Sequence, residues 1–301
     1  MEKTTSQRLF SWFDDRIHIV FIIPAMAVLL GLVVYPLFFN VNLSLHKVNM
    51  LNFTSSNWKF VGLDNFIKTL GDKTVTDALV RTFVFMLGTV SGQLVLGMIG
   101  ALTLNTALKG RGLLTVVVLI PMMMTPVAVG LFWRMLLNNQ WGIINYFLSL
   151  FGIDAIPWLS QSTFAFISVC MVQIWWGVSF VMLVLLGGLS ALPPEPFEAA
   201  QVDGAGRWRS FTLITLPSLS PVISIVVMLR AIDAFREFDI IYTLTQGGPG
   251  VSTRVFSLQL YLTSFESQDF STGAAQALIL TTITLLLASR LIRSMSGESN
   301  G

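Results

Sequence analysis

The sequence is poor in the side chains that build metal sites and disulfides. It contains a single cysteine, Cys170, and two histidines, His18 and His46, in 301 residues. One cysteine excludes an internal disulfide and a cysteine-based metal cluster, and two distant histidines do not make a metal site. Charged residues make up only 11% of the chain and the formal net charge is +2, which is too small for a nucleic-acid-binding surface. We therefore expect no metal centre and no nucleic-acid partner.

The motifs of the common catalytic classes are missing too. The chain has no glycine-rich phosphate loop ending in Gly-Lys-Ser or Gly-Lys-Thr, no His-Glu-x-x-His helix and no Gly-x-Ser-x-Gly elbow. It also lacks the aspartate-rich pair of a membrane prenyltransferase. We expect no catalytic residue here, and any energy from ATP must come from a partner protein.

Long apolar stretches are abundant. Hydrophobic residues make up 54% of the chain and the mean hydropathy is +0.74, far above that of a soluble domain. A spanning helix needs about 20 largely apolar residues. Six stretches qualify, at residues 18–43, 79–104, 113–137, 164–189, 218–243 and 272–292. We predict an all-α membrane protein with six transmembrane helices in one domain, residues 18–292, in contact with membrane lipid.

The two ends of the chain, residues 1–17 and 293–301, are predicted to be cytoplasmic. An even number of spans places both termini on one side, and basic residues mark the inner side. Nine basic residues fall in the predicted inner segments: Lys3, Arg8, Arg16, Lys109, Arg111, Arg207, Arg209, Arg290 and Arg293. Four lysines of the first outer loop weaken the bias: Lys47, Lys59, Lys68 and Lys73. Residues 1–17 have two open interpretations, a short interfacial helix and a disordered leader.

A polar break at residues 193–217 separates the fourth and fifth apolar stretches. Pro193 and Pro194 end the preceding helix, because proline lacks an amide donor and clashes with the turn before it. Pro196 suits the first turn of a new short helix, which we expect to end at about Val202. The following Asp-Gly pair favours a turn with a left-handed residue. The pattern predicts a helix, a turn and a second helical stretch, and the alternative is a simple connector.

The spacing within this break resembles that of a known family. Glu198-Ala199-Ala200, three residues, Gly204, nine residues and then Ile-Thr-Leu-Pro217 is similar to the cytoplasmic loop of permeases of ATP-binding-cassette importers. Asp203 and Ala205 extend the likeness to the carbohydrate branch. Further blocks resemble the larger maltose-permease subunit: residues 60–66, 133–134 with 142–145, and 238–239 with 244–249. The extra N-terminal spans and the large periplasmic insert of that subunit are missing.

The resemblance implies a role for the loop and a set of partners. Its first helix would be a coupling helix that docks into an ATPase subunit, through Glu198, Ala199, Ala200, Asp203 and Gly204. Implied partners are a second permease subunit, two ATPase subunits, an extracytoplasmic solute-binding protein and a carbohydrate substrate. The chain itself would hold no cofactor, since ATP and Mg²⁺ would bind to the ATPase subunits. The implied location is the bacterial inner membrane.

The fifth apolar stretch carries a group of charged residues: Arg230, Asp233, Arg236, Glu237 and Asp239. Charges at membrane depth are costly unless they pair or contact water, and spacings of three and four residues put most of them on one helical face. One interpretation is a set of ion pairs that fastens helices together. The other is a hydrated path for a polar solute.

Polar and aromatic residues also mark the fourth and third stretches. Gln173, Trp175 and Trp176 could contact a sugar in the path, because aromatic faces stack on its C–H face, but tryptophan in a span also serves in packing. The prolines at 121 and 126 around a run of methionines predict an irregular third span, as a kink or as a gate.

The sequence therefore favours the permease subunit of an ATP-driven, binding-protein-dependent sugar importer. A secondary transporter that uses the fifth-span carboxylates for ion coupling is the alternative, and an intramembrane enzyme is a third. Neither alternative requires a helix-turn-helix of this spacing in the loop.

Overall fold

The computed structural model describes residues 22–55, 57–106 and 110–298 of the chain. The interfacial helix considered for residues 1–17 lies outside this range. The chain divides into two compact units. The first comprises Met1–Thr69 and Thr263–Leu278, and the second Leu70–Leu262 and Ile279–Gly301.

The first unit begins with an apolar helix, Ile22–Leu45. It includes a π-helical turn, η1 (Leu30–Val34), and α2 (Tyr35–Leu45). Its most apolar window has 0% of its residues buried, as expected for a helix that depends on lipid or another chain for cover. A small antiparallel hairpin of β1 (His46–Lys47) and β2 (Lys59–Phe60) follows, and then α3 (Asp64–Gly71).

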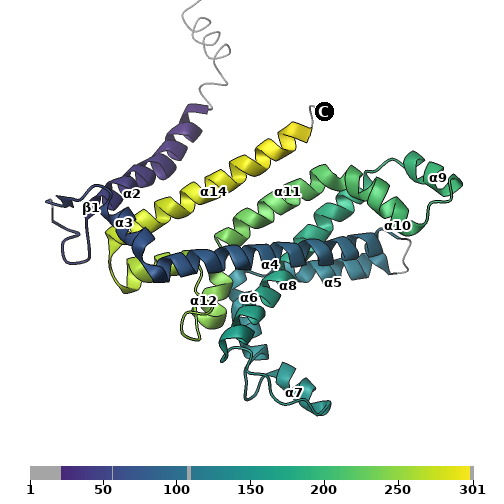
Figure 1. Ribbon diagram of the computed structural model, residues 1–301, viewed down its shortest axis with the longest axis horizontal. Helices are drawn as coiled ribbons and strands as arrows, with labels where there is room; N and C mark the ends of the chain where they lie inside the picture. The colour runs from purple at the N-terminus through teal and green to yellow at the C-terminus, as the bar shows by residue number, and fades with distance from the viewer. Residues whose placement is uncertain (1–21, 56, 107–109, 299–301) are drawn as a thin grey trace, which may run out of the picture. The chain divides into compact units, whose positions relative to one another are not determined.

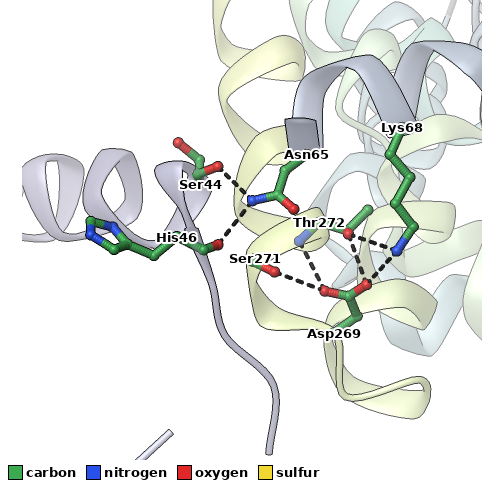
Figure 2. Close-up of polar contacts among 7 residues, drawn as sticks. All are labelled: Ser44, His46, Asn65, Lys68, Asp269, Ser271 and Thr272. Atoms are coloured by element: carbon green, nitrogen blue, oxygen red, sulfur yellow. Dashed lines mark hydrogen bonds and ion pairs between the residues drawn. The ribbon is translucent and has the colours of Figure 1, made fainter. Parts of the chain in front are cut away.

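A polar cluster holds the first unit together (Figure 2). The side-chain amide of Asn65 on α3 donates to the carbonyls of Ser44 and His46, at 2.7 and 2.9 Å. Asp269 caps the start of α14 (Phe270–Glu298), where one carboxylate oxygen accepts from the backbone N–H of Thr272 at 3.1 Å. The other oxygen accepts from Lys68 Nζ at 3.0 Å. The cluster therefore ties α3 to the beginning of α14.

Asp269 is the titratable centre of this cluster. Burial raises the pKa of its carboxyl, but hydrogen bonds from Thr272 and Lys68 outweigh that effect and leave the pKa below its usual value of 3.8. The folded unit therefore favours the carboxylate form.

In the second unit, two long helices run side by side, α4 (Lys73–Leu104) and α8 (Ser162–Ser190) (Figure 1). The other elements are α5 (Arg111–Met123), α6 (Pro126–Leu136), α7 (Ile143–Leu150), α9 (Glu195–Val202), α10 (Arg207–Ser210), η2 (Phe211–Thr215), α11 (Leu216–Phe235), α12 (Asp239–Thr245) and α13 (Phe256–Tyr261). At the end of α13, η3 (Leu262–Glu266) leads into the first unit. Five described helices are long and apolar enough to span a membrane, or six if the bent pair α5–α6 counts as one span.

The third predicted span is not one continuous helix. α5 and α6 meet at an angle of 100°. Pro126 begins α6, and the residue before it, Thr125, has an extended backbone with ψ 143°, as the proline ring demands. Pro121 lies inside α5 without ending it. The expected irregularity of the stretch at 113–137 is confirmed, and it takes the form of two helices joined by a sharp bend.

The fifth predicted span is broken as well. α11 ends at Phe235, and α12 starts at Asp239. The Glu237 carboxylate accepts from the backbone N–H of Ile240 at 3.0 Å, which satisfies one of the free amides at the start of α12. The expectation of one helix over 218–243 was therefore wrong, because a side-chain cap starts a new helix there.

Two apolar clusters form the core of the second unit. The first gathers around α12 and includes Phe85, Phe235, Ile240, Leu244 and Leu258. The second joins the C-terminal halves of α4 and α8 to α11 and includes Met98, Val181, Leu185, Leu219 and Val226. Burial of these side chains fixes the three long helices against one another.

Candidate functional site

The polar break of the sequence folds as the predicted short helix and turn. α9 runs from Glu195 to Val202, with Pro194 at its N-cap and Pro196 in its first turn. Glu195 and Glu198 lie in the same turn, where their charge is favourable near the positive end of the helix dipole. This confirms the helix expected from about Pro196 to Val202.

Gly204 closes the helix in a left-handed conformation, with φ of 70°. Its N–H donates to the carbonyl of Gln201 at 3.1 Å, and the N–H of Ala205 donates to the carbonyl of Ala200 at 2.8 Å. These two bonds form a Schellman cap, which satisfies carbonyls at the helix end. The glycine in the motif is thus explained by backbone geometry.

The surface of α9 is open. None of its residues is buried, and Val202 is 89% exposed. Glu198, Ala199 and Asp203 are exposed and Ala200 is half-buried. In Figure 1, α9 projects beyond the ends of α10 and α11. The loop therefore presents a short capped helix whose side chains are free to meet another protein.

The second candidate site centres on Arg230, which is only 4% exposed. Its Nε donates to Gln93 Oε1 on α4 at 2.9 Å, and its Nη1 lies 3.1 Å from Asp233 Oδ2. The guanidinium also lies over the rings of Trp176 and Phe180 on α8, at 5.4 and 6.0 Å. Arg230 therefore links α11 to both α4 and α8.

The sequence suggested that most of the five charged residues share one helical face. In the structure they do not. Arg230 and Glu237 are buried, whereas Asp233, Arg236 and Asp239 are exposed. The break after Phe235 takes Arg236, Glu237 and Asp239 out of the helical spacing of α11, whereas Asp233 lies on α11 at its edge. The side chain of Asp233 is 59% exposed even though it pairs with Arg230.

The polar residues of the fourth span are used mainly in packing. The indole N–H of Trp176 donates to the carbonyl of Met124 at 3.1 Å, a carbonyl at the break between α5 and α6. Trp175 packs edge-on against Trp133, with ring centroids 5.4 Å apart. Gln173 is fully buried, and its backbone carbonyl accepts from the Gln93 amide at 2.9 Å. Contact of these three residues with a sugar stays a prediction.

Sequence reasoning missed two residues of this cluster. Gln93 is the partner that bridges Arg230 to α8, and its only signal is an isolated amide in an apolar stretch. Gly177 leaves the space for them, since a Cβ there would lie 2.6 Å from Arg230 Nη2 and would also collide with the Gln93 amide. Within the described ranges, no group of three or more His, Cys, Asp or Glu residues could hold a metal ion.

The fold and the loop define a class of protein, a multi-pass membrane permease with an exposed short helix between two spans. The chain belongs to the family of inner membrane components of binding-protein-dependent transport systems, whose family model matches residues 93–296. This confirms the resemblance that the loop spacing indicated. The family is a component of transport systems that depend on a binding protein, and it is not an enzyme family.

Curated relatives match along almost the whole chain. The trehalose/maltose transport system permease MalF of Thermococcus litoralis is 35% identical, over 93% of this chain and 92% of its own length. The sulfoquinovosyl glycerol transport system permease SmoG of Agrobacterium fabrum is 30% identical, over 94% and 92%. The trehalose permease SugA of Mycobacterium tuberculosis is 29% identical, over 100% and 97%.

Solved structures share the fold. A chain of a bacterial ABC transporter that imports the acidic polysaccharide alginate has a TM-score of 0.81 at 21% identity, with 96% of this chain and 98% of that chain covered. The same type of transporter, in complex with an alginate-bound periplasmic protein, gives a TM-score of 0.78 at 20% identity, over 94% and 96%. The chain is thus a multi-pass inner-membrane permease of the ABC importer type, and the secondary-transporter alternative finds no support.

Proposed function

We propose that this chain forms half of the translocation path of an ATP-driven importer of sugars or oligosaccharides. The observation that carries the proposal is α9, a capped helix with no buried residue that ends at Gly204 in the spacing of importer permeases. The substrate class is supported by relatives named for trehalose, maltose and sulfoquinovosyl glycerol transport.

The proposed assembly contains a second permease, two ATPase subunits that bind ATP and Mg²⁺, and an extracytoplasmic solute-binding protein. In it, α9 docks into an ATPase subunit through Glu198, Ala199 and Ala200, while Asp203 and Gly204 set the angle of the helix. The loop and both termini are cytoplasmic. ATP binding closes the ATPase pair, α9 moves with it, and the two permeases rotate against each other to open the path outward.

The exposed and the buried charged residues have different roles in the proposed path. Asp233, Arg236 and Asp239 are exposed on this chain, so they are free to line a hydrated path against the second permease. Arg230 and Glu237 are buried and hydrogen-bonded, which suits residues that hold the wall. Trp175 and Trp176 pack against the apolar cluster and Gln173 is buried; their contact with the sugar in the path stays part of the proposal.

The test is reconstitution of the chain with its partner subunits in proteoliposomes, followed by uptake of labelled sugar delivered by the binding protein. Uptake should require ATP inside and should vanish when the ATPase is omitted. Ala200→Trp should abolish uptake by blocking the surface of α9. Leu51→Trp is the control, because Leu51 is 94% exposed in a loop far from the motif in sequence, and it should leave uptake intact. Uptake driven by an ion gradient without the ATPase would overturn the proposal in favour of a secondary transporter.

A further inference from the structure

A large groove of about 960 Å³ lies between α4 and the coupling loop. Its size is within the range of sites that bind small molecules. One wall is the second half of α4, and the other is formed by α9, α10, η2 and the start of α11. The residues that shape the two walls include Val95, Met98, Ile99, Phe197, Trp208 and Phe211.

The wall on α4 is aliphatic and open. Ile99 is 56% exposed although it lies in a helix apolar enough to span the membrane, and Val95 lies one turn before it on the same face. The opposite wall is aromatic, with the rings of Trp208 and Phe211 packed at 5.7 Å. A surface of this kind is favourable for a flexible hydrocarbon chain and unfavourable for water.

The charge among the residues that line the groove is positive. Arg207 is the single charged residue among those that line it. No ion pair of Arg207 is found in the described part of the chain. It adjoins Trp208, and Ser210 and Gln201 also line the groove. Arginine beside tryptophan, at the end of apolar helices, is the combination that meets anionic headgroups at a membrane surface.

We propose that this groove binds an anionic phospholipid of the surrounding bilayer. The acyl chain lies along Val95 and Ile99 of α4, and the phosphate lies at Arg207. The unpaired positive charge selects an anionic over a zwitterionic headgroup, while the aliphatic and aromatic walls select a lipid over a free phosphate. Because α4 spans the membrane, such a lipid reaches the groove directly from the bilayer.

Native mass spectrometry of the purified transporter complex tests the headgroup end, with phosphatidylglycerol and phosphatidylcholine as probes. Arg207→Gln should weaken binding of phosphatidylglycerol about fivefold, the effect of one basic residue near an anionic surface. Arg209→Gln is the matched control, since Arg209 is exposed on the same short helix but does not line the groove. Phosphatidylcholine should bind weakly to all three proteins. Equal retention of phosphatidylglycerol by the two variants would overturn the proposal, and so would equal binding of the two lipids by the unmodified complex.

A second pair of variants tests the acyl end. Ile99→Trp should fill the groove and reduce bound phosphatidylglycerol at least as much as Arg207→Gln. Leu96→Trp should not, because Leu96 is 51% exposed on α4 but lies outside the groove. An equal effect of both substitutions, or a protein segment that occupies the groove in the assembled transporter, would also overturn the proposal.

Discussion

Gly204 allows a quantitative test of the coupling loop. Its φ of 70° is left-handed, and a Cβ added there would meet nothing within 4 Å. The effect of Gly204→Ala is therefore conformational and not steric, and a left-handed residue with a side chain costs roughly 1–2 kcal/mol. α9 has eight residues and none is buried, so no core opposes its rearrangement. A penalty of about 1–2 kcal/mol lowers the ratio of capped to uncapped loop about 5- to 30-fold.

Two further variants separate conformation from other effects. Gly206→Ala is the control, because Gly206 has φ of −70° and open space around it, so a side chain fits without strain. Gly204→Asn should be intermediate, since asparagine tolerates the left-handed region better than alanine. ATPase association and stimulation of ATP hydrolysis by the loaded binding protein should be highest in the unmodified chain and in Gly206→Ala. Both readouts should then fall through Gly204→Asn to Gly204→Ala.

Each measurement needs the amount of permease in the membrane as its reference, because a loss of protein would imitate a loss of coupling. All variants should reach the membrane equally, since neither Gly204 nor Gly206 belongs to either apolar cluster. If Gly204→Ala and Gly206→Ala hydrolyse ATP equally well in the assembled complex, the left-handed cap has no part in coupling and the reasoning fails.

Three further predictions concern the spans and the first unit. Arg230→Met should destabilise the complex by about 1–3 kcal/mol, because it leaves the buried amide oxygen of Gln93 unpaired. Asp233→Asn should change stability by at most about 1 kcal/mol and should alter uptake. Equal thermal shifts of the two variants would contradict the proposed division between residues of the wall and residues of the path. Trp176→Phe removes the hydrogen bond to the Met124 carbonyl, so it should lower the free energy of unfolding by about 1 kcal/mol and speed hydrogen exchange near Met124. Unchanged exchange would show that this hydrogen bond does not stabilise the break between α5 and α6. The cap at Asp269 should stabilise the folded unit fully above the ordinary carboxyl pKa of 3.8, and this stabilisation should be lost as the pH falls through the lowered pKa of the folded state. Hydrogen exchange at the start of α14 measures this, and Asp269→Asn should remove the pH dependence.

The coupling loop could be predicted from sequence because every signal in it is local. Pro194 and Pro196 determine where α9 begins, and Gly204 determines where it ends, each through its own backbone geometry. The Schellman bonds involve residues no more than five positions apart. No distant contact is needed to specify this element, so its bounds came within a residue of the structure.

The breaks in the third and fifth spans could not be predicted in the same way. In the third span hydropathy continues through the break, because the residues on either side of it are apolar. In the fifth span the break falls among charged residues, and their order alone does not show that Glu237 caps a new helix. Two prolines stood in the third stretch, and only Pro126 breaks the helix. The carbonyl of Met124 at this break accepts a hydrogen bond from the indole N–H of Trp176 on α8, 52 residues away in sequence. Which of the two prolines breaks the helix therefore depends on tertiary contacts.

The charged residues between positions 230 and 239 show why composition alone could not decide between ion pairs that hold helices together and a hydrated path. Burying a guanidinium is costly unless its donors are satisfied. Arg230 meets this need in part, through Gln93 on α4 and the aromatic rings of α8, while its Nη2 is buried without a hydrogen-bond partner. Gln93 in turn donates to the Gln173 carbonyl of α8, so one polar chain connects three helices. Asp233 is then a peripheral partner, with 59% of its side chain exposed. The structure therefore supports the fastening interpretation for Arg230, and the path interpretation stays a prediction for the exposed residues Asp233, Arg236 and Asp239.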